Sequence, residues 1–124
     1  MELIFLGTGG GRINLIKQVR GTGGFRINSK SANIHVDPGP GALIRSIKLK
    51  QFPGTLDLII VTHNHIDHVS DAMVLSEGMT EYGLKKRGIL IGSKNVILGS
   101  EKSDRGVSLY HQSKVKIVYA AEFG

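Results

Sequence analysis

Residues 56–68 read Leu56-Asp57-Leu58-Ile59-Ile60-Val61-Thr62-His63-Asn64-His65-Ile66-Asp67-His68, and this stretch predicts both the fold and the chemistry. The run from 56 to 61 is nearly continuous in β-branched and leucine side chains, which is typical of a strand covered on both faces. Three of the five histidines then follow within six residues. Histidines two residues apart in an extended segment point the same way, so His63 and His65 can face one metal ion. After a turn, Asp67 and His68 can face a second ion.

The chemistry of these donors limits which metal they would hold. The chain has no cysteine, so thiolate ligands and disulfides are excluded. Imidazole and carboxylate donors suit Zn²⁺ and also Fe or Mn. The alternatives are a polar loop whose histidines are incidental, or a helix start capped by Asp67. The spacing, the preceding apolar strand and a predicted following helix together favour the metal site.

Around this stretch, strands and helices alternate, which predicts an α/β layered domain over residues 1–124. The turn-forming residues 29–31 and 37–41 separate two strands from each other and from a helix, and predict a hairpin. Strands are predicted at 2–6, 25–28, 32–36, 56–61, 88–91 and 115–119, and helices at 42–50 and 67–82. The glycine clusters 7–11 and 21–24 lack the third glycine of a dinucleotide fingerprint and are interpreted as tight turns.

Composition favours a single domain with a basic surface. The chain has 124 residues and a formal net charge of +6, from 16 Lys and Arg against 10 Asp and Glu. Such charge can attract RNA or another anionic substrate, although a solvated basic face without a partner is the more common explanation. No apolar stretch is long enough to cross a membrane, and no signal peptide is recognised, so we expect a cytoplasmic protein without a membrane partner.

The run from Thr62 to His68 resembles the H-x-H-x-D-H signature of the metallo-β-lactamase superfamily, and most closely the branch of tRNA 3′-processing ribonucleases. The strand that ends at Gly7-Thr8-Gly9 and the turn at residues 37–41 support the resemblance. It implies an αββα sandwich, a metal-dependent hydrolase, and Zn²⁺ as the cofactor, with two ions when the site is complete. His63 and His65 would hold the first ion, and Asp67 and His68 the second.

The resemblance also implies roles for individual residues. Asp67 would take part in catalysis by orienting the attacking water, and Asp37 would end a strand beneath the metal site and brace the histidine loop. Asp37 is also consistent with a simple Asx turn. His111 is the only histidine after His68 and is a candidate for an extra ligand or a substrate contact. His35 is predicted to be an ordinary strand histidine.

The family's fold contains two similar halves, and this chain matches the N-terminal half: a mixed sheet with helices on one face. The ligands of the second half are not recognised, so either the chain is a fragment of a longer enzyme, or the missing half comes from another polypeptide, for example a second copy in a homodimer. Three functions follow as hypotheses. The first is a hydrolase that favours phosphodiesters, the second a non-catalytic metal-binding half-domain or truncated fragment, and the third a basic nucleic-acid-binding module.

Overall fold

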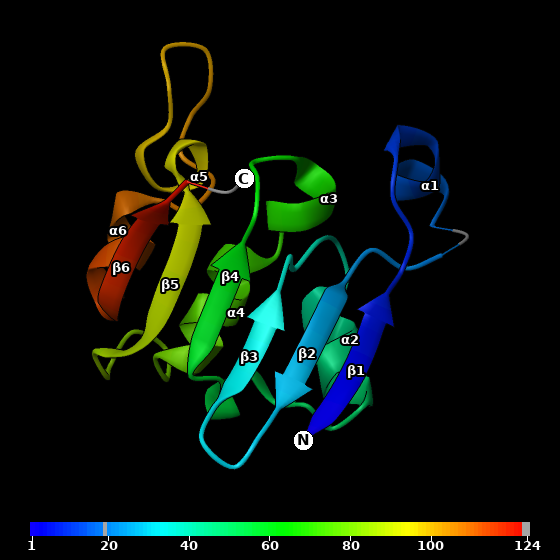
Figure 1. Ribbon diagram of the computed structural model, residues 1–124, viewed down its shortest axis with the longest axis horizontal. Helices are drawn as coiled ribbons and strands as arrows, with labels where there is room; N and C mark the ends of the chain where they lie inside the picture. The colour runs from blue at the N-terminus through cyan, green and yellow to red at the C-terminus, as the bar shows by residue number, and fades with distance from the viewer. Residues whose placement is uncertain (19, 123–124) are drawn as a thin grey trace.

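One mixed sheet of six strands forms the framework of the molecule (Figure 1). A computed structural model describes residues 1–18 and 20–122. The strands lie across the sheet in chain order: β1 (Glu2–Gly7), β2 (Gly24–Asn28), β3 (Asn33–Val36), β4 (Leu58–Val61), β5 (Arg87–Ser93) and β6 (Val115–Ala121). The pairs β1–β2 and β2–β3 are antiparallel, and the pairs from β3 to β6 are parallel. The predicted hairpin is β2–β3.

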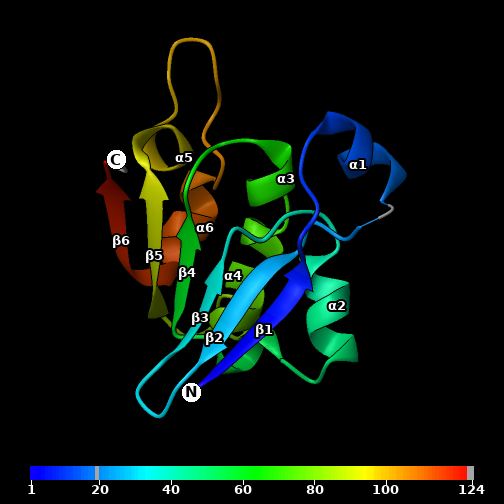
Figure 2. The same cartoon turned by 45° about the vertical axis from the view of Figure 1, so that its right-hand side comes forward.

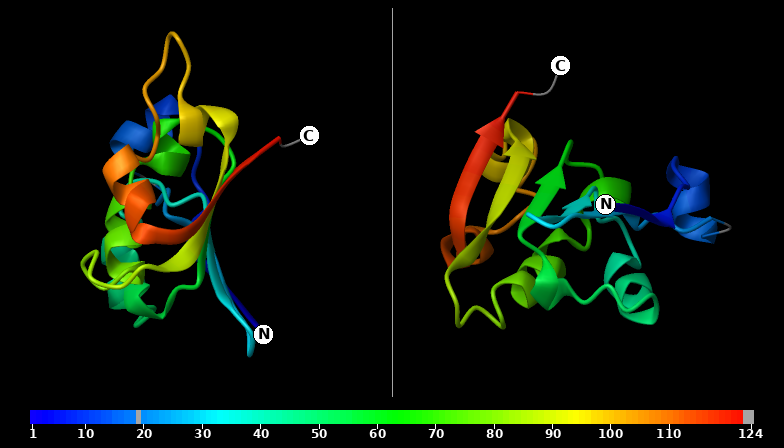
Figure 3. Two further views of the ribbon diagram at one scale, coloured as in Figure 1. Left: turned by 90° about the vertical axis from the view of Figure 1, so that its left-hand side faces the viewer. Right: turned by 60° about the horizontal axis from the view of Figure 1, so that its bottom comes forward.

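The helices of the described residues are short and connect these strands. They are α1 (Arg12–Lys17), α2 (Ala42–Lys48), the 3-10 helix η1 (Pro53–Thr55), α3 (Ile66–Val69), α4 (Ala72–Met79), α5 (Lys94–Leu98) and α6 (Leu109–Lys114). The left panel of Figure 3 shows α2, α4 and α6 on the same side of the sheet. This arrangement confirms the predicted mixed sheet with helices on one face.

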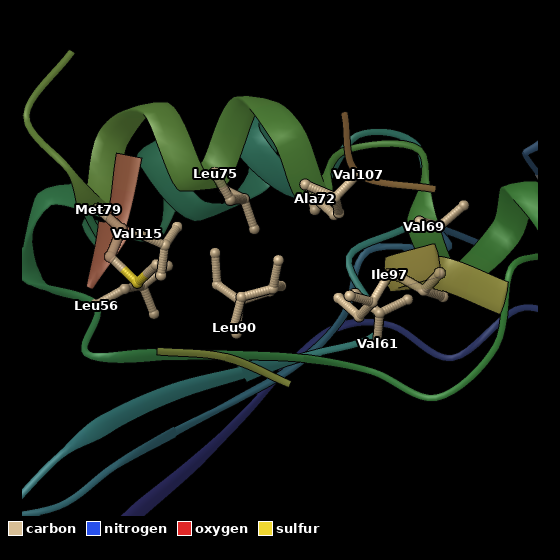
Figure 4. Packing of buried hydrophobic residues seen from close by; sticks show 13 residues of the cluster. Leu56, Val61, Val69, Ala72, Leu75, Met79, Leu90, Ile97, Val107 and Val115 are labelled. Atoms are coloured by element: carbon tan, nitrogen blue, oxygen red, sulfur yellow. The ribbon is translucent and has the colours of Figure 1, made fainter. Parts of the chain in front are cut away.

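The core lies between the sheet and this helix layer. Alternate strand residues face the helices, so Ile59, Val61 and Leu90 are fully buried. Figure 4 shows Leu75 and Met79 of α4 packed towards Leu90 of β5. Burying such side chains stabilises the fold by roughly 1.5–3 kcal/mol each. In the described part of the chain, no helix has the length and apolar character needed to cross a membrane.

The predicted helix over 67–82 is divided in two at Ser70 and Asp71. The amide of Asp71 donates to the carbonyl of Pro38 at 2.9 Å, and its carboxylate accepts from the amide of Leu43 at 3.0 Å. These contacts with the 37–41 turn and α2 fix the backbone at Asp71 outside the helical region, at φ −97° and ψ 6°. Tertiary hydrogen bonds therefore override the local helical pattern.

Candidate metal centre

The histidine loop begins where β4 ends and closes with the single turn of α3 (Figure 1). His65 is the residue before α3, and its carbonyl accepts from the amides of His68 and Val69 at 2.9 and 3.0 Å. This turn brings three imidazoles together. The ring centroid of His63 lies 4.7 Å from that of His65 and 4.0 Å from that of His68.

Asp37 braces this loop from the end of the neighbouring strand β3. Its backbone has a left-handed φ of 52°, an uncommon conformation for a residue with a side chain. One carboxylate oxygen, Oδ1, accepts from the amide of Thr62 at 2.7 Å, and the other, Oδ2, accepts from the Thr62 hydroxyl at 2.8 Å. Oδ2 also lies 3.2 Å from Nδ1 of His68. The strained backbone is thus held where its carboxylate can reach two parts of the loop.

The hydroxyl of Thr62 fixes how His63 is protonated. It has one hydrogen, which it donates to Asp37, so it accepts from Nδ1–H of His63 at 2.9 Å. The Nε2 atom of His63 then carries the lone pair that a metal ligand requires. Burial lowers the pKa of His63, and the neighbouring His68 and His65 lower it further. The neutral, ligand-competent imidazole is therefore favoured.

His68 and Asp67 form a second pair of donors. Nε2 of His68 lies 3.3 Å from Oδ2 of Asp67. Two ligands that each lie about 2.0–2.1 Å from one tetrahedral ion are about 3.3 Å apart, so this pair fits a shared ion such as Zn²⁺. Nδ1 of His68 is buried and forms no hydrogen bond of good geometry, although Oδ2 of Asp37 lies 3.2 Å away.

The donor types and this pair distance fit a metal, but the described residues do not complete a coordination sphere. Across residues 1–18 and 20–122, no group of three or more His, Asp or Glu side chains is placed to hold one ion. Structural zinc sites use four protein ligands and catalytic sites use three with a water. The described residues therefore supply only part of a coordination sphere.

The other two histidines make separate contacts. Nδ1 of His111, in α6, lies 2.7 Å from the Ser108 hydroxyl, and its Nε2 lies 3.0 Å from a carboxylate oxygen of Glu77. These contacts join α6 to α4 and do not join His111 to the histidine loop, so its role as an extra ligand or substrate contact stays a prediction. His35 is fully buried in β3 and contacts the carbonyl of Gly23 through Nε2 at 2.8 Å.

Sequence reasoning missed two supports of the loop. A Cβ at Gly39 would lie 2.1 Å from the carbonyl oxygen of Asp67, so only glycine allows the 37–41 turn to approach α3 this closely. Asn64 donates to the Ser103 hydroxyl at 3.1 Å and to the Asp104 carbonyl at 3.0 Å. The motif places Asn64 between two histidines, but no local pattern indicates a partner so distant in the sequence.

A pocket of about 650 Å³ lies between the loop and α1. Figure 2 shows α1 and α3 at the same end of the molecule. Arg12, Leu15 and Ile16 line one wall of the pocket, and His65 and Asp67 line the other. A substrate bound there would contact both the donor cluster and a guanidinium group.

Comparison with known proteins identifies the family to which this chain belongs. The profile of the Beta-lactamase superfamily domain matches residues 32–111. An uncharacterised protein of Methanocaldococcus jannaschii is 42% identical over 125 residues, which cover 98% of this chain and 47% of that protein. The ribonuclease Z of Metallosphaera sedula is 29% identical over 96 residues, covering 77% of this chain and 32% of that enzyme.

A solved structure shows the same fold. The short form of human tRNase Z superposes with a TM-score of 0.60 at 23% identity, over 75% of this chain and 34% of that one. The matched part of the chain thus covers about half the length of the Methanocaldococcus protein and about a third of the other two.

Proposed function

This chain belongs to the metallo-β-lactamase superfamily, and we propose that it provides one side of a dinuclear metal centre that hydrolyses phosphodiesters. His63 and His65 would hold one ion, and Asp67 and His68 the other. The single observation that supports this most strongly is the clustering of the three imidazoles at the end of β4, braced by Asp37. Zn²⁺ is the preferred ion, because the donors are imidazole and carboxylate groups and the chain has no thiolate.

The chain's own residues prepare this chemistry. Metal ions bound here would lower the pKa of a water molecule and polarise the scissile group. Thr62 and Asp37 hold His63 in the tautomer whose Nε2 can bind. The Asp67 carboxylate lines the pocket and would accept a hydrogen bond from the attacking water, which orients it.

A phosphodiester such as RNA is the favoured substrate class. The net charge of +6 attracts a polyanion. Arg12 faces the pocket opposite His65 and can pair with a phosphate oxygen. Two of the similar proteins carry the names ribonuclease Z and tRNase Z, which supports RNA as the substrate to test first.

The remaining ligands must come from outside the described residues, because these supply fewer than three donors to any one point. We propose that residues 1–124 act as one half-domain, completed by a second copy or by a C-terminal half, in the same or in another polypeptide. The relatives contain enough additional chain for such a half.

The test combines metal analysis with turnover. The purified chain, dialysed against Zn²⁺, should retain the metal, and it should hydrolyse bis(p-nitrophenyl) phosphate when a second copy or the C-terminal half completes the site. His63→Ala and Asp67→Asn should each lose both properties. His111→Ala tests a separate prediction, that His111 is an extra ligand or substrate contact, because its imidazole contacts Ser108 and Glu77 and not the histidine loop. Metal content in the wild type no higher than in His63→Ala would refute the proposal.

A second function is favoured by the incomplete coordination sphere. A half-domain of this kind could bind metal without catalysis. It would retain Zn²⁺ in a manner that depends on His63 and show no turnover on phosphodiesters, lactones or thioesters.

A further inference from the structure

A second hollow, of about 630 Å³, lies in the helix layer between α2, η1 and α4. It is on the solvent side of α4, because Val74 and Glu77 line it, whereas Leu75 of the same helix is buried in the core. All its lining residues fall between Leu43 and Tyr82, and none of them lines the pocket beside the histidine loop. Its volume is within the range of about 300–1,000 Å³ that small-molecule sites occupy.

The walls of this hollow are apolar and include two exposed aromatic rings. Leu43, Ile47 and Val74 contribute aliphatic side chains. Phe52 precedes η1 and Tyr82 follows α4, and these residues are 52% and 82% exposed. Such rings stack on the face of a planar ligand, and a nucleobase gains affinity in this way whatever its sequence context. The walls therefore favour a flat aromatic ligand.

Tyr82 is held at the hollow by a strained turn. Glu81 and Tyr82 have left-handed φ values of 49° and 64°, which are rare for residues with bulky side chains. The amide of Tyr82 donates to the carbonyl of Glu77 at 2.8 Å, which ties the turn back to α4. Backbone strain of this kind persists only where the surrounding structure holds it, and it is concentrated at functional sites. The turn thus keeps an aromatic ring exposed beside the hollow.

Glu77 and Glu81 are the only charged residues in the lining. Oε1 of Glu77 lies 3.0 Å from Nε2 of His111. Oε2 of Glu81 lies 2.8 Å from Nζ of Lys85. These contacts orient both carboxylates and engage one oxygen of each. Because a carboxylate accepts through both oxygens, the other oxygen of each group can accept from N–H groups of a ligand.

Lysines flank the segments that line the hollow. Lys48 and Lys50 lie at the end of α2, and Lys85 and Lys86 follow the turn that holds Tyr82. All four are exposed. A purely cationic ligand would be repelled by these ammonium groups, and a purely anionic one by the carboxylates of the lining. The charges therefore favour a ligand with N–H donors at one end and an anionic group at the other.

We propose that this hollow binds a guanine nucleotide, either free or as one residue of an RNA chain. The base would stack on Phe52 and Tyr82, its N–H groups would donate to Glu77 and Glu81, and its phosphate would pair with the flanking lysines. The hollow is separate from the histidine loop and needs no metal ion. The inference therefore does not rest on the proposed function.

The carboxylates favour guanine over the other bases. Guanine carries two neighbouring N–H donors on one edge, N1–H and the 2-amino group, and carboxylate oxygens accept from both. Adenine and cytosine have a ring-nitrogen acceptor beside their amino group, and uracil has a carbonyl on each side of its N–H. Each of these bases would turn at least one acceptor towards a carboxylate, which leaves both groups without a donor.

Calorimetric titration of the full chain with nucleoside monophosphates in EDTA tests the site. GMP should bind saturably, and AMP and UMP about 10-fold more weakly or less, because their edges are mismatched. Tyr82→Ala should weaken GMP binding by about 10-fold through the loss of stacking. Because Tyr82 is 82% exposed, this variant should keep the circular dichroism spectrum of the wild type. The matched control is Tyr119→Ala, because Tyr119 is 60% exposed on β6 and does not line the hollow.

Glu81→Gln separates recognition of the base from general attraction to the lysines. Glutamine keeps the size of the side chain but puts a donor where the carboxylate accepts, so the preference for GMP over AMP should fall by about 10-fold. If the lysines alone attracted nucleotides, removal of a negative charge would instead strengthen the binding of GMP and AMP equally. Glu101→Gln removes the same charge from an exposed residue outside the hollow and should keep the preference.

A fluorescent pentaribonucleotide with one central guanine distinguishes the two sources of the ligand. An RNA site binds it more tightly than GMP and releases it when GMP is added, whereas a site for the free nucleotide binds GMP alone; both results support the inference. It would be overturned by the absence of saturable binding of either probe up to about 5 mM, or by equal affinities for GMP, AMP and UMP. Unchanged GMP affinity in Tyr82→Ala, or occupation by a cationic amphipathic peptide that GMP does not displace, would also overturn it.

Discussion

Acidification should destabilise this protein through His35, which lies on the helix side of β3. The side chain is fully buried, and burial lowers its pKa from 6.5 to about 4. Nε2 lies 2.8 Å from the carbonyl of Gly23 and, in the neutral ring, donates to it, whereas Nδ1 has no hydrogen-bond partner. A protonated ring would place a second N–H, and a charge, where nothing accepts them.

The size of the effect follows from the two pKa values. The unfolded chain binds a proton near pH 6.5 and the folded chain only near pH 4, so the unfolded state holds more protons between these values and stability falls as the pH falls. With 1.36 kcal/mol per pKa unit, the loss approaches about 3 kcal/mol below pH 4 and reaches about 2 kcal/mol at pH 5. The free energy of unfolding of a domain is only about 5–15 kcal/mol, so this loss is a large part of it.

Urea unfolding at intervals from pH 7.5 to pH 4.5 measures this loss of unfolding free energy, with His35→Gln as the reference variant. Glutamine can keep a donor to Gly23 but does not titrate, so the difference in unfolding free energy between the two proteins isolates His35 from the other histidines. Between pH 7 and pH 5, we expect the unfolding free energy of the wild type to fall by about 2 kcal/mol relative to that of the variant. A difference that stays flat over this range would show that the buried ring is not held neutral.

Three further substitutions test the supports of the fold and the loop. Thr62→Val removes the hydroxyl between Asp37 and His63, and should weaken Zn²⁺ binding by about 10–100-fold in a competition titration with a chelator. Gly39→Ala puts a methyl group 2.1 Å from the carbonyl oxygen of Asp67, and should cost about 2 kcal/mol or more in urea unfolding and lower metal retention. Arg26→Met removes the hydrogen bonds of the buried guanidinium to the carbonyls of Gln51 and Phe52 and to the Thr55 hydroxyl, and should cost about 2–4 kcal/mol in the same assay.

Each of these substitutions has a control or a contradicting result. Gly10→Ala is matched to Gly39→Ala, because a Cβ at Gly10 would meet nothing within 4 Å. It should leave both stability and metal retention unchanged. Equal metal affinity in Thr62→Val and wild type would contradict the role of the hydroxyl in orienting His63. An unfolding free energy of Arg26→Met equal to that of the wild type would mean that water donates hydrogen bonds to the carbonyls of Gln51 and Phe52 in place of the guanidinium.

The sequence predicted the elements whose signals are local. The apolar run 56–61 predicted β4, and the turn residues before and after β3 predicted the hairpin and the start of α2. The clustering of His63, His65 and His68 also followed from local geometry, because alternate residues of an extended segment share a side and the next turn closes the loop. The resemblance of these residues to a known motif predicted the family, which the comparison confirmed.

Other features depend on contacts between distant residues and left no local signal. The division between α3 and α4 arises from hydrogen bonds of Asp71 to Pro38 and Leu43. The helix α1 has no buried residue and follows a glycine cluster, so neither helical periodicity nor a capping residue indicated it. The strands β5 and β6 extend beyond their predicted ends through pairing with each other.

The two faces of the sheet explain why a metal centre could form on this chain and yet stay open. The helix side is filled by its own core, which holds β3 and β4 in place and so positions Asp37 and the histidine loop at their ends. The other side carries large apolar side chains at alternate strand positions, among them Val36 and Ile60 near the same two strand ends. A segment that packs against Val36 and Ile60 would therefore lie near the end of β4, where the histidine loop begins.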